Sequence, residues 1–169
     1  MTDKTNALAT AAPKNPRFQS GKTTRTVEFS AYLTGANSDA GDKIVLASGL
    51  SLADRVSAIR PNATNVPALT GATDNNLGFF YKDEKGVLQE LDADILWNGV
   101  TLASVYTGSN ILTGKNSSLD QSQNIGQLLG LGNDKEPVGG IYLVLTTVVA
   151  NTATATVRLA IDIDVSTTS

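Results

Sequence analysis

The sequence predicts an all-β protein, an antiparallel sandwich or barrel with one short helix and an extended N-terminal arm. Three observations support this fold class. Seven or eight segments are strand-like, with turn residues between most of them. The closing stretch 153–165 has apolar residues at odd positions and mostly polar residues at even ones. Charged residues make up only 17% of the chain, against about 25% in an average domain, and small polar residues replace them.

The length of 169 residues favours one domain with a substantial core. Residues 1–22 have no hydrophobic periodicity, and Pro13 and Pro16 resist both helix and central strand. We therefore expect an extended arm over 1–22, without contacts to its own body, and a single β-sandwich domain over 23–169.

The expected strands follow from alternation and β-branched content. Two hairpins are expected. In the first, residues 83–86 form a tight turn, and in the second, Asn151 and Thr152 connect the last two strands. Val56, Ala58 and Arg60 are expected on one side of their strand. In chain order, the expected strands are 23–33, 43–48, 51–63, 77–83, 87–97, 139–150 and 153–165.

One helix is expected over 124–132, where apolar residues cluster at helical spacing. Asn124 or Ser122 is a suitable N-cap, and Gly130 or Gly132 a suitable C-terminal residue.

The chain contains no His and no Cys. It therefore lacks the commonest general base and metal ligand, and the best thiol nucleophile. We predict that the protein is not an enzyme and needs no cofactor. The first residues lack the apolar core of a signal peptide, and no window reaches about 18 apolar residues, so no membrane segment is expected.

The net charge of −3 is unevenly distributed. Residues 1–25 contain five basic side chains against Asp3 alone, so this segment carries +4 and the rest of the chain −7. A basic, extended arm suggests a segment that lies on a partner. An acidic protein surface is a simpler partner than nucleic acid, because only one aromatic residue, Phe18, stands among the basic residues. The candidate partner-binding residues are Lys4, Lys14, Arg17, Phe18 and Lys22.

Two further groups have alternative interpretations. Asp162 and Asp164 point the same way on a strand, roughly 7 Å apart, and Asp92 and Asp94 repeat the spacing. They fit a solvated strand face, although two pairs on neighbouring strands would also suit a structural cation. Likewise, the aromatic side chains of Tyr81, Trp97 and Tyr106 either fill a β core or form a sugar-stacking platform.

Three stretches together resemble a known group of proteins. They are GDKIVLASGLSLADRVSAIRP (41–61), TDNNLGFFYKDEKGVLQELDADILWNGVTLAS (73–104), and the region from NIGQLLGLG to AIDIDV (124–165). Their order resembles small virion structural proteins of tailed bacteriophages, and the resemblance covers most of 26–165. LGFFYKDEKG departs from the Gly-aromatic-x-x-Asp-Gly run typical of the group, and the loop 107–123 has no counterpart in it.

The resemblance implies a head decoration, or cement, protein with a jelly-roll-like sandwich on the outside of the capsid shell. It also implies that the partners are the major capsid protein and neighbouring copies in a homo-oligomer, without nucleic acid or membrane. The protein would be synthesised in the host cytoplasm and end in the virion. A tail, head–tail joining or fibre-base protein remains an alternative, and a carbohydrate-binding module is an alternative of another class.

Overall fold

The structure is a computed structural model that describes residues 3–5, 23–33, 39–61, 74–101, 123–150 and 157–167. The predicted all-β class with one short α-helix is confirmed for these residues. The helices are α2 (Ile125–Leu129) and the 3-10 helix η1 (Asn133–Lys135). The strands are β1 (Asp3–Thr5), β2 (Thr23–Leu33), β3 (Lys43–Leu50), β4 (Asp54–Pro61), β5 (Asn75–Lys82), β6 (Leu88–Val100), β7 (Ile141–Thr147) and β8 (Val157–Thr167).

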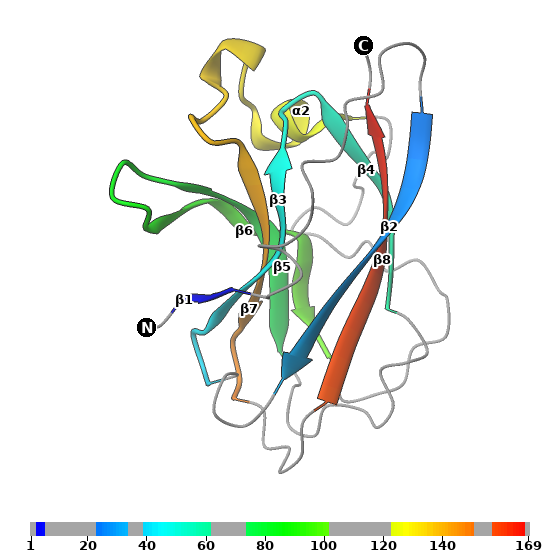
Figure 1. Ribbon diagram of the computed structural model, residues 1–169, viewed down its shortest axis with the longest axis vertical. Helices are drawn as coiled ribbons and strands as arrows, with labels where there is room; N and C mark the ends of the chain where they lie inside the picture. Colours follow the sequence, from blue (N-terminus) through cyan, green and yellow to red (C-terminus); the bar gives the residue numbers. More distant parts are fainter. Residues whose placement is uncertain are drawn as a thin grey trace.

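The strands form two sheets that lie side by side as two layers (Figure 1). One sheet has five strands in the order β1-β3-β7-β5-β6, and the other has three in the order β2-β8-β4. Neighbouring strands are antiparallel, except that β1 runs parallel to β3. The described strands therefore form the antiparallel arrangement that the turn-rich sequence predicts.

The register of β2 on β8 aligns the apolar positions of both strands. Val27 is opposite Ile163, and Phe29 is opposite Ile161. Residues directly opposite in an antiparallel pair lie on the same face of the sheet. The apolar positions of the two strands thus form one shared row. Asp162 belongs to the alternate row of positions, where it is opposite Glu28 of β2 on one side and Arg60 of β4 on the other.

The expected grouping of Val56, Ala58 and Arg60 on one side of β4 is wrong, because a bulge interrupts the strand. Val56 is opposite Val165, but Ala58 is opposite Asp164, so β4 has one extra residue there. A bulge places two residues opposite one and reverses the alternation beyond it. Arg60 consequently lies in the row of Asp162, not in the row of Val56.

The expected hairpin between the last two long strands is also wrong. β7 pairs with β3 and β5 in the five-stranded sheet, whereas β8 lies between β2 and β4 in the other sheet. The chain therefore passes from one layer to the other between Thr147 and Val157. Asn151–Thr152 fits a tight turn locally, but long-range pairing of apolar rows decides where β8 lies.

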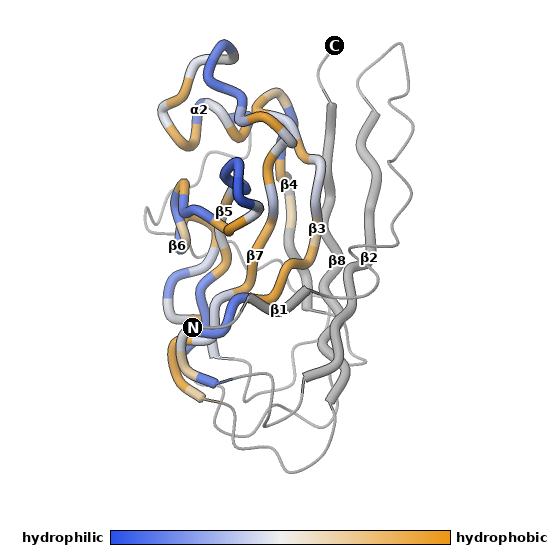
Figure 2. The backbone as a smooth tube through the Cα atoms, turned by 60° about the vertical axis from the view of Figure 1, so that its left-hand side comes forward, coloured by the Kyte–Doolittle hydropathy of each residue, from blue (hydrophilic) through white to orange (hydrophobic). Residues whose placement is uncertain are grey.

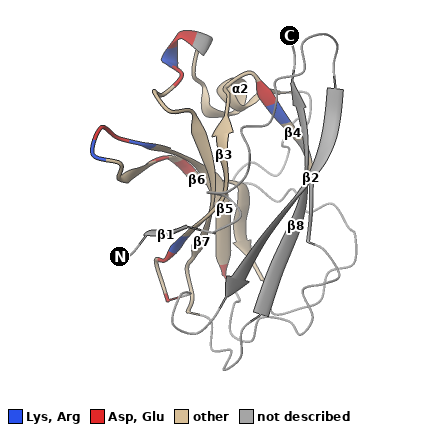
Figure 3. Ribbon diagram, in the orientation of Figure 1, with Lys and Arg blue, Asp and Glu red and all other residues tan. Residues whose placement is uncertain are grey.

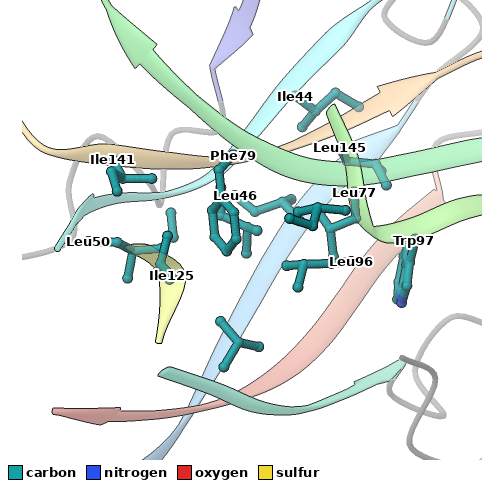
Figure 4. Close-up of a cluster of buried hydrophobic side chains, with 14 of the residues drawn as sticks. Ile44, Leu46, Leu50, Leu77, Phe79, Leu96, Trp97, Ile125, Ile141 and Leu145 are labelled. Carbon is teal, nitrogen blue, oxygen red and sulfur yellow. The ribbon is translucent and has the colours of Figure 1, made fainter. Parts of the chain in front are cut away.

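The main core lies between the two sheets (Figure 4). Phe79 of β5 and Trp97 of β6 are its largest side chains, and both are fully buried. Val56 of β4 and Ile125 of α2 belong to the same cluster, so both layers and the helix contribute to it. The labelled core residues in Figure 4 are Ile44, Leu46, Leu50, Leu77, Phe79, Leu96, Trp97, Ile125, Ile141 and Leu145.

Helix α2 closes one end of this core, where it contacts β4 and β6. Asn124 caps the helix in a capping box with Gln127, and Gly130 ends it in the left-handed conformation with φ 67°. Asn124 and Gly130 are each one of the two residues predicted for that end, and the helix is shorter than the predicted 124–132. The backbone N–H of Gly126 donates to the carbonyl oxygen of Leu52 at 2.9 Å, which ties the helix to the turn between β3 and β4.

Strand β6 has a pronounced irregularity against β5. Leu77 is opposite Trp97 and Phe79 is opposite Asp92, so residues 93–96 of β6 face Gly78 alone. A Cβ atom at Gly78 would overlap the carbonyl oxygen of Asp92 and come within 2.7 Å of the Cα of Ala93. The two backbones approach so closely that only glycine fits at this position.

We therefore expect Gly78→Ala to prevent folding, because backbone on both sides of the contact would have to move. Gly86→Ala is the matched control. Gly86 has φ 78° but open space around its Cα, so only backbone strain of about 1–2 kcal/mol applies. Thermal unfolding monitored by circular dichroism measures both variants. If Gly78→Ala melted no lower than Gly86→Ala, the close approach would be wrong.

Candidate interaction surfaces

Only one of the five candidate partner-binding residues falls in a described segment. Lys4 is the middle residue of β1, whose backbone is in register with β3 at Ile44. Lys14, Arg17, Phe18 and Lys22 lie outside the described residues. Their proposed contact with a partner therefore remains a prediction.

The expectation that residues 1–22 make no contact with their own domain is wrong at residues 3–5. β1 pairs in parallel with the outer edge of β3, with Asp3 opposite Lys43 and Thr5 opposite Val45. Hydrophobic periodicity predicts which side chains are buried, but an edge strand also offers unpaired backbone groups. Any extended segment can pair with such groups, whatever its side-chain pattern.

The β5–β6 hairpin projects from the five-stranded sheet, and its tip is charged (Figures 1 and 3). Asp83 organises this tip. Its carboxylate accepts hydrogen bonds from the backbone N–H groups of Lys85 at 2.9 Å and Val87 at 2.8 Å, and from the side chain of Gln89 at 2.9 Å. The predicted turn over 83–86 is confirmed, since Gly86 N–H donates to the Asp83 carbonyl oxygen. The projecting tip is thus held in one conformation.

A second apolar cluster supports the base of this hairpin. Val45, Phe80, Leu88 and Val144 are buried on the face of the five-stranded sheet that points away from the main core. The ammonium group of Lys43 lies 4.8 Å from the Phe80 ring centroid, and that of Lys82 lies 5.2 Å from the Tyr142 ring centroid. These cation–π contacts cover the cluster with alkyl chains and leave the charges at the surface.

A second projecting feature follows η1. The N–H of Gly140 donates to the carbonyl oxygen of Pro137 at 3.0 Å, and the intervening Val138 is 96% exposed. Ser51 donates a hydrogen bond to Glu136 at 2.9 Å, which joins this loop to the turn after β3. Sequence reasoning missed this exposed valine, although the run Pro-Val-Gly-Gly signals a turn.

The aspartate pairs do not come together as a two-pair cation site. Asp92 and Asp94 lie on β6, at an edge of the five-stranded sheet, whereas Asp162 and Asp164 lie on β8, in the centre of the other sheet. Asp92 accepts a hydrogen bond from the backbone of Asp94, and Asp94 accepts one from Asn98 at 3.1 Å. In the described part of the chain, no three His, Cys, Asp or Glu residues gather in a group that could hold a metal ion.

The aromatic platform for a sugar is contradicted by the burial of Trp97. Its side chain is 0% exposed and lies in the main core. Tyr81 is half-buried on β5, and Tyr106 lies outside the described residues. A stacking platform needs an accessible ring face, which Trp97 lacks. No helix among the described residues is long and apolar enough to cross a membrane.

The tip of the hairpin should depend on the ionised form of Asp83. Hydrogen bonding from the Val87 backbone lowers the pKa of Asp83, while partial desolvation opposes the shift, and Gln89 and Lys85 lower it further. A carboxyl with a depressed pKa contributes fully above its unfolded-state pKa, and the contribution is lost as pH falls through the folded-state pKa. The tip should therefore stay ordered at neutral pH and loosen under acid conditions.

At neutral pH, Asp83→Ala should raise the hydrogen-exchange rates of the Lys85 and Val87 amides about tenfold, because both lose a charged acceptor. Amides of β7 serve as the control and should be unchanged. Equal exchange in the variant and the parent protein would contradict the role of Asp83.

Divalent metal removal should leave the melting temperature unchanged if the aspartates are only surface and turn groups. The measurement is a thermal melt with and without EDTA. A fall of several degrees that Ca²⁺ reverses would instead indicate a bound cation that stabilises by mass action.

No protein-family model matches this chain, and no curated protein matches it. Among solved structures, it is similar to a chain of the structure described as "Capsid of Ralstonia phage GP4". The similarity covers 99% of both chains, with a TM-score of 0.64 and 11% sequence identity. At this identity the likeness shows that the two chains share a fold.

Proposed function

We propose that this protein is a structural component of a tailed-phage virion that binds the outside of the capsid shell as a decoration, or cement, protein and stabilises it. The observation that carries the proposal is the end-to-end likeness of fold to a chain from a phage capsid structure. The resemblance of the stretches between residues 41 and 165 to small phage virion proteins supports it independently, because it rests on sequence alone.

The strand order supports a jelly-roll arrangement as part of this proposal. β2 pairs with β8, β3 pairs with β7, and the β5–β6 hairpin lies innermost in the chain. These three pairs are therefore nested in the chain, like successive pairs along one long hairpin. Jelly rolls are built in this way from two Greek keys, and viral capsid domains often use them.

Three carboxylates accept hydrogen bonds that fix turns, and two of them, Asp42 and Asp54, are buried, which supports a structural role for these groups. Asp42 accepts a hydrogen bond from the backbone of Asp39, Asp54 from that of Ser51, and Asp83 from that of Lys85. Each such bond fixes a turn at the end of a strand. We propose that this chain uses its acidic groups to stiffen a body that binds other proteins.

We further propose that the arm over 1–22 provides part of the binding surface, with the major capsid protein and neighbouring copies as partners. Its charge of +3 against −6 for the rest of the chain favours contact with acidic protein surfaces. The alternative of a tail, head–tail joining or fibre-base protein has the same fold requirements. The carbohydrate-binding alternative loses its main support, because Trp97 is buried.

The direct test is reconstitution. Purified protein should bind to particles that lack it, and micrographs should show added density on the shell, at regular positions. The loaded particles should also resist heat better than empty ones. Density confined to the tail, or no binding to the shell at any concentration, would contradict the decoration role.

Removal of basic side chains from the arm tests its role in shell binding. Changing Lys14, Arg17 and Lys22 to Ser should weaken shell binding at low salt. This variant should also lose less affinity than the parent as salt rises, because the screened contacts are already gone. The matched control changes Lys85, Lys115 and Lys135 to Ser, which removes the same charge from outside the arm. Equal binding of both variants would refute a specific role for the arm.

A further inference from the structure

The pairing of β1 with β3 has the properties of an exchangeable contact. β1 has three residues, it lies at the edge of its sheet, and it pairs in parallel, the slightly weaker arrangement. Terminal segments with few hydrogen bonds open at a free energy close to zero, well below that of global unfolding. β1 is therefore expected to leave and rejoin β3 while the rest of the domain stays folded.

The acceptor edge is well defined. Lys43, Ile44 and Val45 continue regularly against β7 on one side and receive β1 on the other. Beyond Val45, register shifts interrupt β3 before Ala47 and again before Leu50. Irregular edges resist pairing, so the regular acceptor is limited to the three residues that β1 covers.

The tether is long enough to reach another molecule. Residues 6–22 separate β1 from β2, and a chain of this length can span up to about 55–60 Å. A folded domain of this size has a diameter of about 40 Å. A copy of β1 can thus reach the β3 edge of an adjacent copy as well as its own.

We propose that, on the assembled shell, residues 3–5 of one copy pair with the Lys43–Val45 edge of a neighbouring copy, so that the copies are linked by exchanged N-terminal strands. This inference rests on the proposed shell function. The same backbone hydrogen bonds form within one chain or between two, so exchange costs little beyond bringing two copies together. A shell that holds copies side by side supplies this proximity as a high effective concentration.

The partner is a second copy because its strand is the one that already fits the edge. The register places Asp3 opposite Lys43, a pairing of opposite charges in the sequence, and Lys4 opposite Ile44. Exchange would connect neighbours without any new side-chain interface, and the connection would add to whatever contacts hold each copy on the shell.

The absence of cysteine permits a clean cross-linking test. Asp3 and Lys43 are Cα partners, and neighbouring strands lie about 4.7–4.9 Å apart, within the range that a disulfide spans. Two single variants, Asp3→Cys and Lys43→Cys, are mixed, bound to shells and oxidised. Because each chain carries one thiol, a disulfide between the two positions can form only between copies. Peptide mass spectrometry identifies the linked pair.

The matched control mixes Asp3→Cys with Lys85→Cys, whose thiol lies on the exposed hairpin tip. If strands are exchanged on shells, the cross-link between positions 3 and 43 should form in at least tenfold higher yield than the control cross-link between positions 3 and 85. The cross-link between positions 3 and 43 should disappear when the same mixture is dilute and not bound to shells. The double variant Asp3→Cys/Lys43→Cys should close its bond within one chain in dilute solution.

The outcomes separate the two proposals. Shell binding with a cross-link yield no higher than the control would overturn strand exchange and leave the decoration role standing. Failure of the parent protein to bind shells would overturn the decoration role, and exchange on the shell with it.

Discussion

The fold depends on a five-stranded sheet whose centre is apolar on both faces. In β7, Ile141, Leu143 and Leu145 belong to the main core, while Val144 and Tyr142 belong to the second cluster on the opposite face. Figure 2 shows this hydrophobic stretch along β7. One face holds the three-stranded sheet and α2, and the other supports the base of the hairpin. A strand buried on both sides in this way cannot move without disturbing both clusters.

The projecting features follow from that constraint. Because the second cluster includes Leu88 and Phe80, the first residues of β6 and the last of β5 are fixed before the hairpin leaves the sheet. The bulge opposite Gly78 then changes the direction of β6, so that Trp97 reaches the main core. The hairpin is thus a rigid extension of the core, and its tip is set by hydrogen bonds to one carboxylate.

Local patterns predicted the elements well and their partners poorly. The capped helix, the turn at 83–86 and the closing strand follow from neighbouring residues. Alternation predicts the closing strand over 153–165, and the structure has it at Val157–Thr167. The place of β8 between β2 and β4 depends on residues more than a hundred positions away, which no local pattern records. The local sequence does not predict the bulge in β4 either, because Val56, Ala58 and Arg60 alternate regularly in sequence. Four of the five candidate arm residues, all except Phe18, rest on charge alone, and among the five only Lys4 lies in a described segment.

The central position of β8 has a consequence for biosynthesis. β8 comes after β2 and β4 in the chain, yet both of these strands pair with it. During translation these two strands have no β8 to pair with, so the nascent chain exposes apolar rows and open edges that aggregate readily. The second layer therefore forms late, once β8 has been made, and a chain that stops short of Val157 has no strand to join β2 to β4.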